Sequence, residues 1–93
     1  MKRTARLSPH AGRDLLRLAS FLSVKNPDAA LRALLAIEDA ARSLETLGER
    51  GKPGPHDARE LIVRFGRDGY AIRYTLSASE VIITRIFHGR EQR

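Results

Sequence analysis

Apolar residues recur at helical spacing through the first half of the chain. One set consists of Ala11, Leu15, Leu18, Ala19 and Leu22, and a second of Ala30, Leu34, Ile37, Ala41 and Leu44. Each set falls on one face of an α-helix, because residues three or four positions apart lie side by side on a helix surface. A break at residues 25–28 separates the two sets. The pattern predicts two amphipathic helices that form an αα-hairpin.

Both predicted helices start at residues that can cap them. Ser8 precedes Pro9, and proline fits the first helical turn because its missing N–H would have no partner there. Asn26 or Asp28 can cap the second helix in the same way. Residues 3–8, which precede the first cap, form a short predicted strand.

After a loop rich in Gly and Pro at residues 48–57, apolar residues occupy every second position. Turns at 66–69 and 77–80 divide this region into three predicted strands. Pairing Phe65 with Tyr70, and Leu76 with Val81, across these turns gives a β-meander. One face of the meander then receives Leu61, Val63, Phe65, Tyr70, Ile72, Tyr74, Leu76, Val81, Ile83 and Phe87. We expect an α+β fold in one domain over residues 1–93, with the N-terminal strand and the αα-hairpin packed on a small antiparallel β-meander sheet.

The opposite face of the predicted meander is mixed in character. It carries Glu60, Ile62, Arg64, Ala71, Arg73, Thr75, Ile82, Thr84, Ile86 and His88. No predicted element remains to cover it, and exposed isoleucines on a sheet favour aggregation unless a second polypeptide hides them. Arg85 breaks the pattern because it falls on the apolar face. Either Arg85 extends to the sheet margin, or a β-bulge shifts the last strand.

The charge of the chain narrows the class of partner. Seventeen Lys and Arg against eleven Asp and Glu give a formal charge of +6, and fourteen of the seventeen are arginine. Arginine favours bidentate contact with phosphate or carboxylate, so we expect nucleic acid or an acidic protein surface as partner. The chain has no cysteine, no signal-peptide pattern and no apolar run long enough to span a membrane. We expect a cytoplasmic protein with no metal, no cofactor and no membrane contact.

Four basic residues are the main candidates for chemistry or contact. Arg64 and Arg73 share the mixed face, and Arg90 follows the last strand. His88 could act as a general acid or base, because histidine exchanges protons near neutral pH. It could equally be a strand-end histidine without chemistry. The chain contains neither a phosphate-binding glycine loop nor a serine nucleophile motif.

The order of these elements and several local strings resemble the RelE/ParE superfamily of bacterial toxin–antitoxin toxins. The resemblance begins at RLSPHAGRDLLRLASFL, continues through ARSLETLGERG and is strongest in RELIVRFGRDGYAIRY and VIITRIFHGREQR. It implies a short sheet curved against a helical hairpin, action in the cytoplasm and a cognate antitoxin whose C-terminal segment wraps the toxin. Such a segment, usually acidic, would cover Ile62, Ile82 and Ile86 in a hetero-oligomer.

The superfamily divides by target: RelE-like members cut messenger RNA on the ribosome, and ParE-like members poison DNA gyrase. Where the nucleases often have an arginine after Gly-Tyr, this chain has Ala71, and Ile62 replaces a frequent lysine. Arg64 and Arg90 remain basic, but no tyrosine follows His88, so one proton-transfer role stays unfilled. The resemblance favours a ParE-like gyrase inhibitor. The alternative is a RelE-like ribosome-dependent mRNA endoribonuclease that uses Arg64, His88 and Arg90.

The mixed face and the residues just after it form the predicted binding surface for target or antitoxin. Its members are Arg64, Arg73, His88, Arg90, Ile62, Ile82 and Ile86. No catalytic residue is assigned outside the nuclease alternative. Burial of the three isoleucines beneath the chain's own helices would contradict this prediction.

Overall fold

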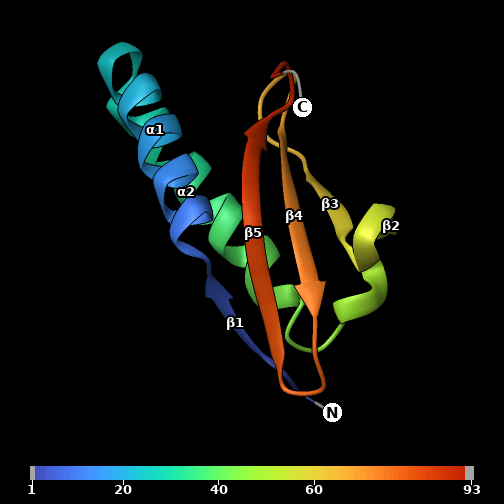
Figure 1. Cartoon of the computed structure of the whole chain (residues 1–93). Coiled ribbons are helices and arrows are strands. Elements are labelled where there is room, and N and C mark those ends of the chain that lie inside the picture. Colours follow the sequence, from blue (N-terminus) through green and yellow to red (C-terminus); the bar gives the residue numbers. More distant parts are fainter. Residues whose placement is uncertain (1, 92–93) are drawn as a thin grey trace.

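A helical hairpin lies against one side of a mixed β-sheet (Figure 1). The computed structural model describes residues 2–91. The strand order is β1-β5-β4-β3-β2, in which β1 runs parallel to β5 and the other neighbouring pairs are antiparallel. In chain order the elements are β1 (Thr4–Leu7), α1 (Pro9–Lys25), α2 (Pro27–Ser43), β2 (Lys52–Pro53), β3 (Arg59–Val63), β4 (Tyr70–Leu76) and β5 (Glu80–His88).

Both helices begin at predicted capping residues. The Oγ of Ser8 accepts a hydrogen bond from Ala11 N–H at 3.1 Å, and the side-chain oxygen of Asn26 accepts one from Ala29 N–H at 3.1 Å. Asn26 also ends α1, so a single residue separates the two helices. Among the described residues, no helix combines the length and apolar composition needed to cross a membrane.

The apolar faces of the helices and of the sheet bury one another, as the periodicity predicts. α1 packs along β5, whereas α2 contacts β3 and β4. The core consists of Ala11, Leu18, Ala33, Ile37, Leu44, Leu61, Val63, Tyr70, Ile72, Tyr74, Val81, Ile83 and Ile86. The structure therefore confirms the predicted α+β class, and it adds the short edge strand β2 to the sheet.

Tyr74 fixes the segment that follows α2. Its hydroxyl donates a hydrogen bond to the Gly48 carbonyl at 2.6 Å and accepts one from Gly51 N–H at 2.9 Å. A Cβ at Gly51 would collide with the phenol, which explains why glycine occupies this position. The buried phenol thus ties the loop before β2 to the middle of the sheet.

The pairing of β3 with β4 differs from the predicted register by two residues. Tyr70 lies opposite Val63 instead of Phe65, and Leu61 lies opposite Ile72. A shift of two residues keeps every side chain on its original face, because side chains alternate with a period of two. The faces predicted for β3 and β4 are therefore confirmed even though the register is wrong.

A β-bulge in β5 confirms the predicted faces up to Ile83 and overturns those after it. Leu76 pairs with Val81 as predicted, but the register shifts between Arg73 and Tyr74 of β4. Thr84 is the extra residue, since Tyr74 pairs with Ile83 and Arg73 with Arg85. The bulge explains the position of Arg85, which faces away from the core.

Three face assignments after the bulge were consequently wrong. Ile86 pairs with Ile72 and is fully buried in the core, so it cannot be an exposed contact for a partner. Phe87 pairs with Ala71 on the side away from the helices. His88 pairs with Tyr70 and shares its side of the sheet.

The bulge lies at the point where the pairing of β5 with β1 ends. β1 pairs with β5 only as far as Ile83, and Ser8 extends the contact by donating its N–H to the Ile83 carbonyl at 2.8 Å. Beyond this point the buried carboxylate of Asp14 on α1 accepts a hydrogen bond from Ile86 N–H at 2.9 Å. Beyond Ile83, a side chain of α1 therefore replaces β1 as the hydrogen-bonding partner of β5.

Candidate functional site

The face of the sheet turned away from the helices, which we call the outer face, carries part of the predicted binding surface. Its side chains are Glu60, Ile62, Ala71, Arg73, Thr75, Ile82, Arg85 and Phe87. Ile62 is 62% exposed, and Ile82 is half-buried. Arg64 lies just beyond the end of β3, is exposed and forms no ion pair within residues 2–91. Two of the three predicted isoleucines thus remain accessible from this side.

Phe87 carries two stacked arginines on the outer face. The guanidinium carbons of Arg73 and Arg85 lie 5.0 and 4.7 Å from the ring centroid, within the range of a cation–π contact. Arg73 also forms an ion pair with Glu60, its neighbour on β3, at 2.9 Å. These contacts hold both guanidinium groups over the aromatic ring, which is 4% exposed.

Asp14 holds Arg85 from the helix side. Its carboxylate accepts a hydrogen bond from Arg85 Nε at 2.8 Å, in addition to the bond from Ile86 N–H. Burial alone would raise the pKa of the Asp14 carboxyl, but the bonds from Arg85, Ile86 and Arg17 outweigh burial and lower this pKa below its usual value. The same hydrogen bond, which Arg85 donates to Asp14, raises the pKa of Arg85. Both groups are therefore charged at neutral pH.

His88 does not join the outer face. Its ring makes an edge-to-face contact with Tyr70, at 5.5 Å between centroids. Its Nδ1 accepts a hydrogen bond from the main-chain N–H of Arg90 at 3.2 Å, and its own N–H donates to Glu91 at 2.6 Å. The histidine thus belongs to a turn that ends β5, on the opposite side of the sheet from Arg73.

The segment after β5 is fixed against the turn between β3 and β4. Arg90 forms an ion pair with Asp68 at 3.1 Å, and Gly89 N–H donates to the Gly69 carbonyl at 2.9 Å. A Cβ at Gly89 would collide with the carbonyl oxygen of Asp68. The glycine of the His-Gly-Arg string is therefore required for close approach of the two turns.

The predicted site residues form two groups rather than one. Arg64, Arg73, Ile62 and Ile82 belong to the outer face or its end, whereas His88 is anchored to Tyr70 and Ile86 is in the core. Of the three predicted arginines, Arg73 and Arg90 are paired with carboxylates, and Arg64 has no such partner in the described part of the chain. This arrangement offers apolar and cationic contacts, and it places His88 on the opposite side of the sheet from Arg73.

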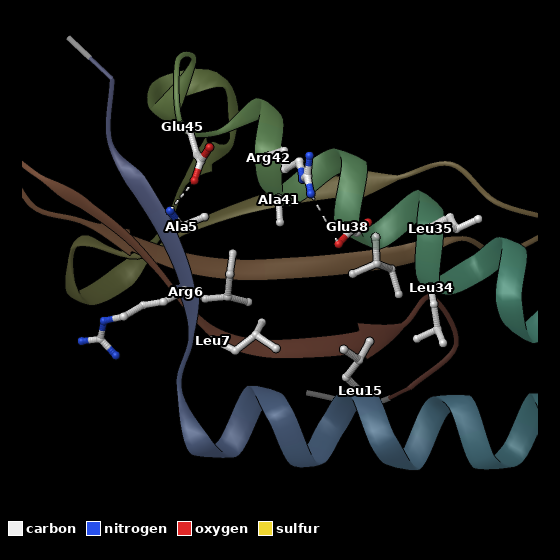
Figure 2. A pocket seen from close by; sticks show the side chains of 12 residues that line it. Ala5, Arg6, Leu7, Leu15, Leu34, Leu35, Glu38, Ala41, Arg42 and Glu45 are labelled. Carbon is white, nitrogen blue, oxygen red and sulfur yellow. Dashed lines mark hydrogen bonds and ion pairs between the residues drawn. The ribbon is translucent and has the colours of Figure 1, made fainter.

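A groove between β1 and α2 was not anticipated from the sequence. It encloses about 780 Å³. Figure 2 shows Leu7 of β1, Leu15 of α1 and Leu34 of α2 directed into it, with Arg6 turned the other way. Leu7 is 42% exposed and Leu35, on the α2 wall, is 51% exposed. The signal in the sequence is Leu35, an apolar residue of α2 that lies outside the face predicted to pack on the sheet.

Comparison with known proteins places the chain among toxin–antitoxin toxins. Toxin RelE1 of Caulobacter vibrioides is 41% identical over 90 residues, covering 97% of each chain, and toxin RelE3 of the same organism is 36% identical over 91 residues, covering 98% of this chain and 99% of that protein.

Solved structures agree with this fold. A chain from the chromosomal ParDE system of Pseudomonas aeruginosa superimposes with a TM-score of 0.77 at 21% identity, covering 94% of this chain and 96% of that one. A chain of the RelBE2 toxin–antitoxin complex from Mycobacterium tuberculosis gives 0.68 at 26% identity, covering 95% and 99%. The family model described as ParE toxin of type II toxin–antitoxin system, parDE, matches residues 5–93. The chain therefore belongs to the ParE toxin family and is a type II toxin of the ParE/RelE superfamily.

Proposed function

We propose that this toxin stops growth by binding and poisoning DNA gyrase in the cytoplasm, and that a cognate antitoxin neutralises it. The observation that carries the choice of target is the position of His88. It lies against Tyr70 on the side of the sheet opposite Arg73, with its Nδ1 occupied by the Arg90 N–H. Because His88 is not positioned beside Arg73 to transfer a proton, this surface is suited to binding a protein rather than to cleaving RNA.

Metal-free RNA cleavage makes demands that this arrangement does not favour. It requires a base for the 2′-hydroxyl, an acid for the leaving oxygen and a cation for the charge that develops on phosphorus. Arg64 has no ion-pair partner within residues 2–91, but Arg73 is paired with Glu60. Ala71 and Ile62, which lie near these arginines, have side chains that cannot donate or accept a proton. These features support a protein partner as the target.

The proposed contact with gyrase is formed by the accessible part of the outer face. Ile62 supplies an exposed apolar group, and Arg64, two residues further along, supplies a charge that forms no ion pair with any other described residue. Apolar and arginine side chains that are close together are typical of the residues that dominate protein interfaces. Ile82 and Arg73 extend the same surface, and Arg90 lies at its end.

An exchange of charge at Arg64 tests this proposal. We expect Arg64→Glu to weaken inhibition of gyrase supercoiling by at least about tenfold, since one charged hydrogen bond at an interface is worth this much. Arg32→Glu is the matched control, because Arg32 is also exposed but lies on α2. A wild-type protein that leaves supercoiling unchanged would refute the gyrase target, and equal effects of the two substitutions would refute the surface.

The ribosome-dependent nuclease remains the second candidate, and the names of the relatives favour it. Two relatives are named as RelE toxins, and one structural neighbour is a RelBE2 complex. Cleavage of messenger RNA on purified ribosomes, lost in His88→Ala while the fold is retained, would establish this alternative. Its roles would fall to Arg64, His88 and Arg90.

Both the positive charge of the chain and its β1–α2 groove support an antitoxin as partner. The chain carries a formal charge of +6, and the β1–α2 groove presents exposed leucines that water does not favour. The structural neighbours come from toxin–antitoxin systems. We expect the neighbouring reading frame to encode a partner with an acidic end, which co-purifies with the toxin as a hetero-oligomer.

A further inference from the structure

The free edge of β1 points its main chain into the β1–α2 groove. Thr4 and Ser8 donate their N–H groups to carbonyls of Ser79 and Ile83, on the β5 side. Main-chain groups alternate in direction along a strand, so the N–H groups of Ala5 and Leu7 point away from β5. They face the groove, in which Leu7 is 42% exposed.

Glu45, in the turn after α2, occupies part of this edge. Its main-chain oxygen accepts the Arg3 N–H at 2.7 Å, and its carboxylate accepts the Ala5 N–H at 2.7 Å (Figure 2). A side-chain oxygen therefore stands where the carbonyl of a neighbouring strand would lie. The next outward N–H, that of Leu7, has no acceptor within residues 2–91.

Building on the proposed antitoxin partner, we propose that one extended antitoxin segment adds a further strand to β1, and that Glu45 holds the first hydrogen-bonding position until this segment arrives. The edge is short, because β1 has four residues. The added strand pairs with Leu7 directly, and it reaches Ala5 only by displacing the Glu45 carboxylate. An exposed edge that is blocked by a charged side chain is protected against indiscriminate pairing.

The two sides of the edge define the chemistry of the segment. Ala5 and Leu7 pair with core residues of β5, so their side chains lie on the groove side together with Leu34 and Leu35. Arg6 lies on the other side and is half-exposed, although it pairs with Glu80. The segment that fits therefore alternates apolar residues toward the groove with acidic residues toward Arg6.

The decisive variants act on one main-chain N–H. Leu7→Pro removes the outward N–H and spares the bonds to β5, which come from Thr4 and Ser8. Leu7→Ala keeps the N–H and loses only the apolar side chain. We expect Leu7→Pro to bind the antitoxin encoded in the neighbouring frame about tenfold more weakly than Leu7→Ala, by calorimetric titration. Equal affinities would overturn the proposal.

A second pair of variants tests the role of Glu45. Glu45→Ala leaves the Ala5 N–H without its acceptor in the free toxin, so the antitoxin no longer competes and should bind about fivefold more tightly than to wild type. Glu45→Gln retains a side-chain oxygen and should stay close to wild type. Unchanged or weaker binding of the antitoxin by Glu45→Ala would overturn the proposal. A Glu45→Ala variant that forms a stable homodimer and binds the antitoxin with unchanged affinity would overturn it as well.

These results separate the strand proposal from the proposed function. Circular dichroism and thermal melting establish that each variant is folded, and amide exchange at Leu7 should slow when wild type binds the antitoxin. If wild type binds the antitoxin but the paired variants do not differ, only the strand proposal fails. If wild type binds no product of the neighbouring frame, the antitoxin partner and the strand proposal fail together. Failure to inhibit gyrase affects neither result.

Discussion

At the scale of single residues, Asp14 has more influence than its place in an amphipathic helix suggests. It is a carboxylate that is 3% exposed, and it accepts hydrogen bonds from the Arg85 side chain and from Ile86 N–H. Helical periodicity places it near the buried face of α1, where an unpaired charge would be costly. Its partners on β5 remove this cost and fix the helix to the bulge.

Replacing Asp14 tests this role. We expect Asp14→Asn to lower the free energy of unfolding by about 2 kcal/mol, because it weakens charge-assisted hydrogen bonds to a buried group. Urea unfolding measures the change. Glu38→Gln is the control, since it removes only an exposed pair with Arg42 on α2 and should cost well under about 1 kcal/mol. Equal losses in the two variants would contradict the assigned role.

The same carboxylate predicts a dependence on pH. The pKa of Asp14 is lower in the folded chain than the ordinary value of 3.8, so its stabilising contribution is complete above that value and is lost as the pH falls through the folded pKa. We expect the stability difference between wild type and Asp14→Asn to be constant from neutral pH down to about 5 and to shrink in stronger acid. A stability difference that grows on acidification would mean that folding raises the pKa of Asp14, and it would contradict this prediction.

At the scale of elements, β5 behaves as two half-strands joined at Thr84. Before the bulge, Val81 and Ile83 face the helices; after it, Ile86 does so and Arg85 and Phe87 face outward. One residue therefore decides which half of the alternating pattern is buried. Arg73 and Arg85 can both stack on Phe87 only because the bulge places Arg85 and Phe87 on the outer face.

Deletion of Thr84 tests the bulge. Without it, every later side chain would change face, so that Arg85 would enter the core and Ile86 would be exposed. We expect the free energy of unfolding to fall by more than about 3 kcal/mol, since a buried unpaired charge is among the most destabilising changes. Deletion of Ser79, in the exposed turn before β5, should be tolerated better. Chemical denaturation followed by circular dichroism compares the two.

At the scale of the whole molecule, charge and shape have different roles. The formal charge of +6 attracts an acidic partner over a distance comparable with the Debye length, whereas the groove and the β1 edge act only on contact. We expect association of the antitoxin to slow by at least about tenfold between 50 and 500 mM salt, while its dissociation rate changes far less. Stopped-flow or surface-based kinetics would show this, and salt-independent association would contradict it.

Helix limits, helix faces and the alternation of β3 and β4 could be predicted because they depend on neighbours in the sequence. Ser8 and Asn26 cap helices that follow them directly, and a two-residue error in the β3–β4 register leaves the faces unchanged. The outer-face positions of Ile62 and Arg73 follow from the same alternation.

The sequence by itself thus determined the family, the helical hairpin and the two faces of the first part of the meander, since these follow from local spacing. Only the tertiary structure decided the phase of the last strand and the edge of β1. The carboxylate that anchors the bulge belongs to Asp14, 72 positions before Ile86, and Glu45 reaches Ala5 from 40 positions away. No local pattern encodes such contacts, because they form only when distant segments are packed together.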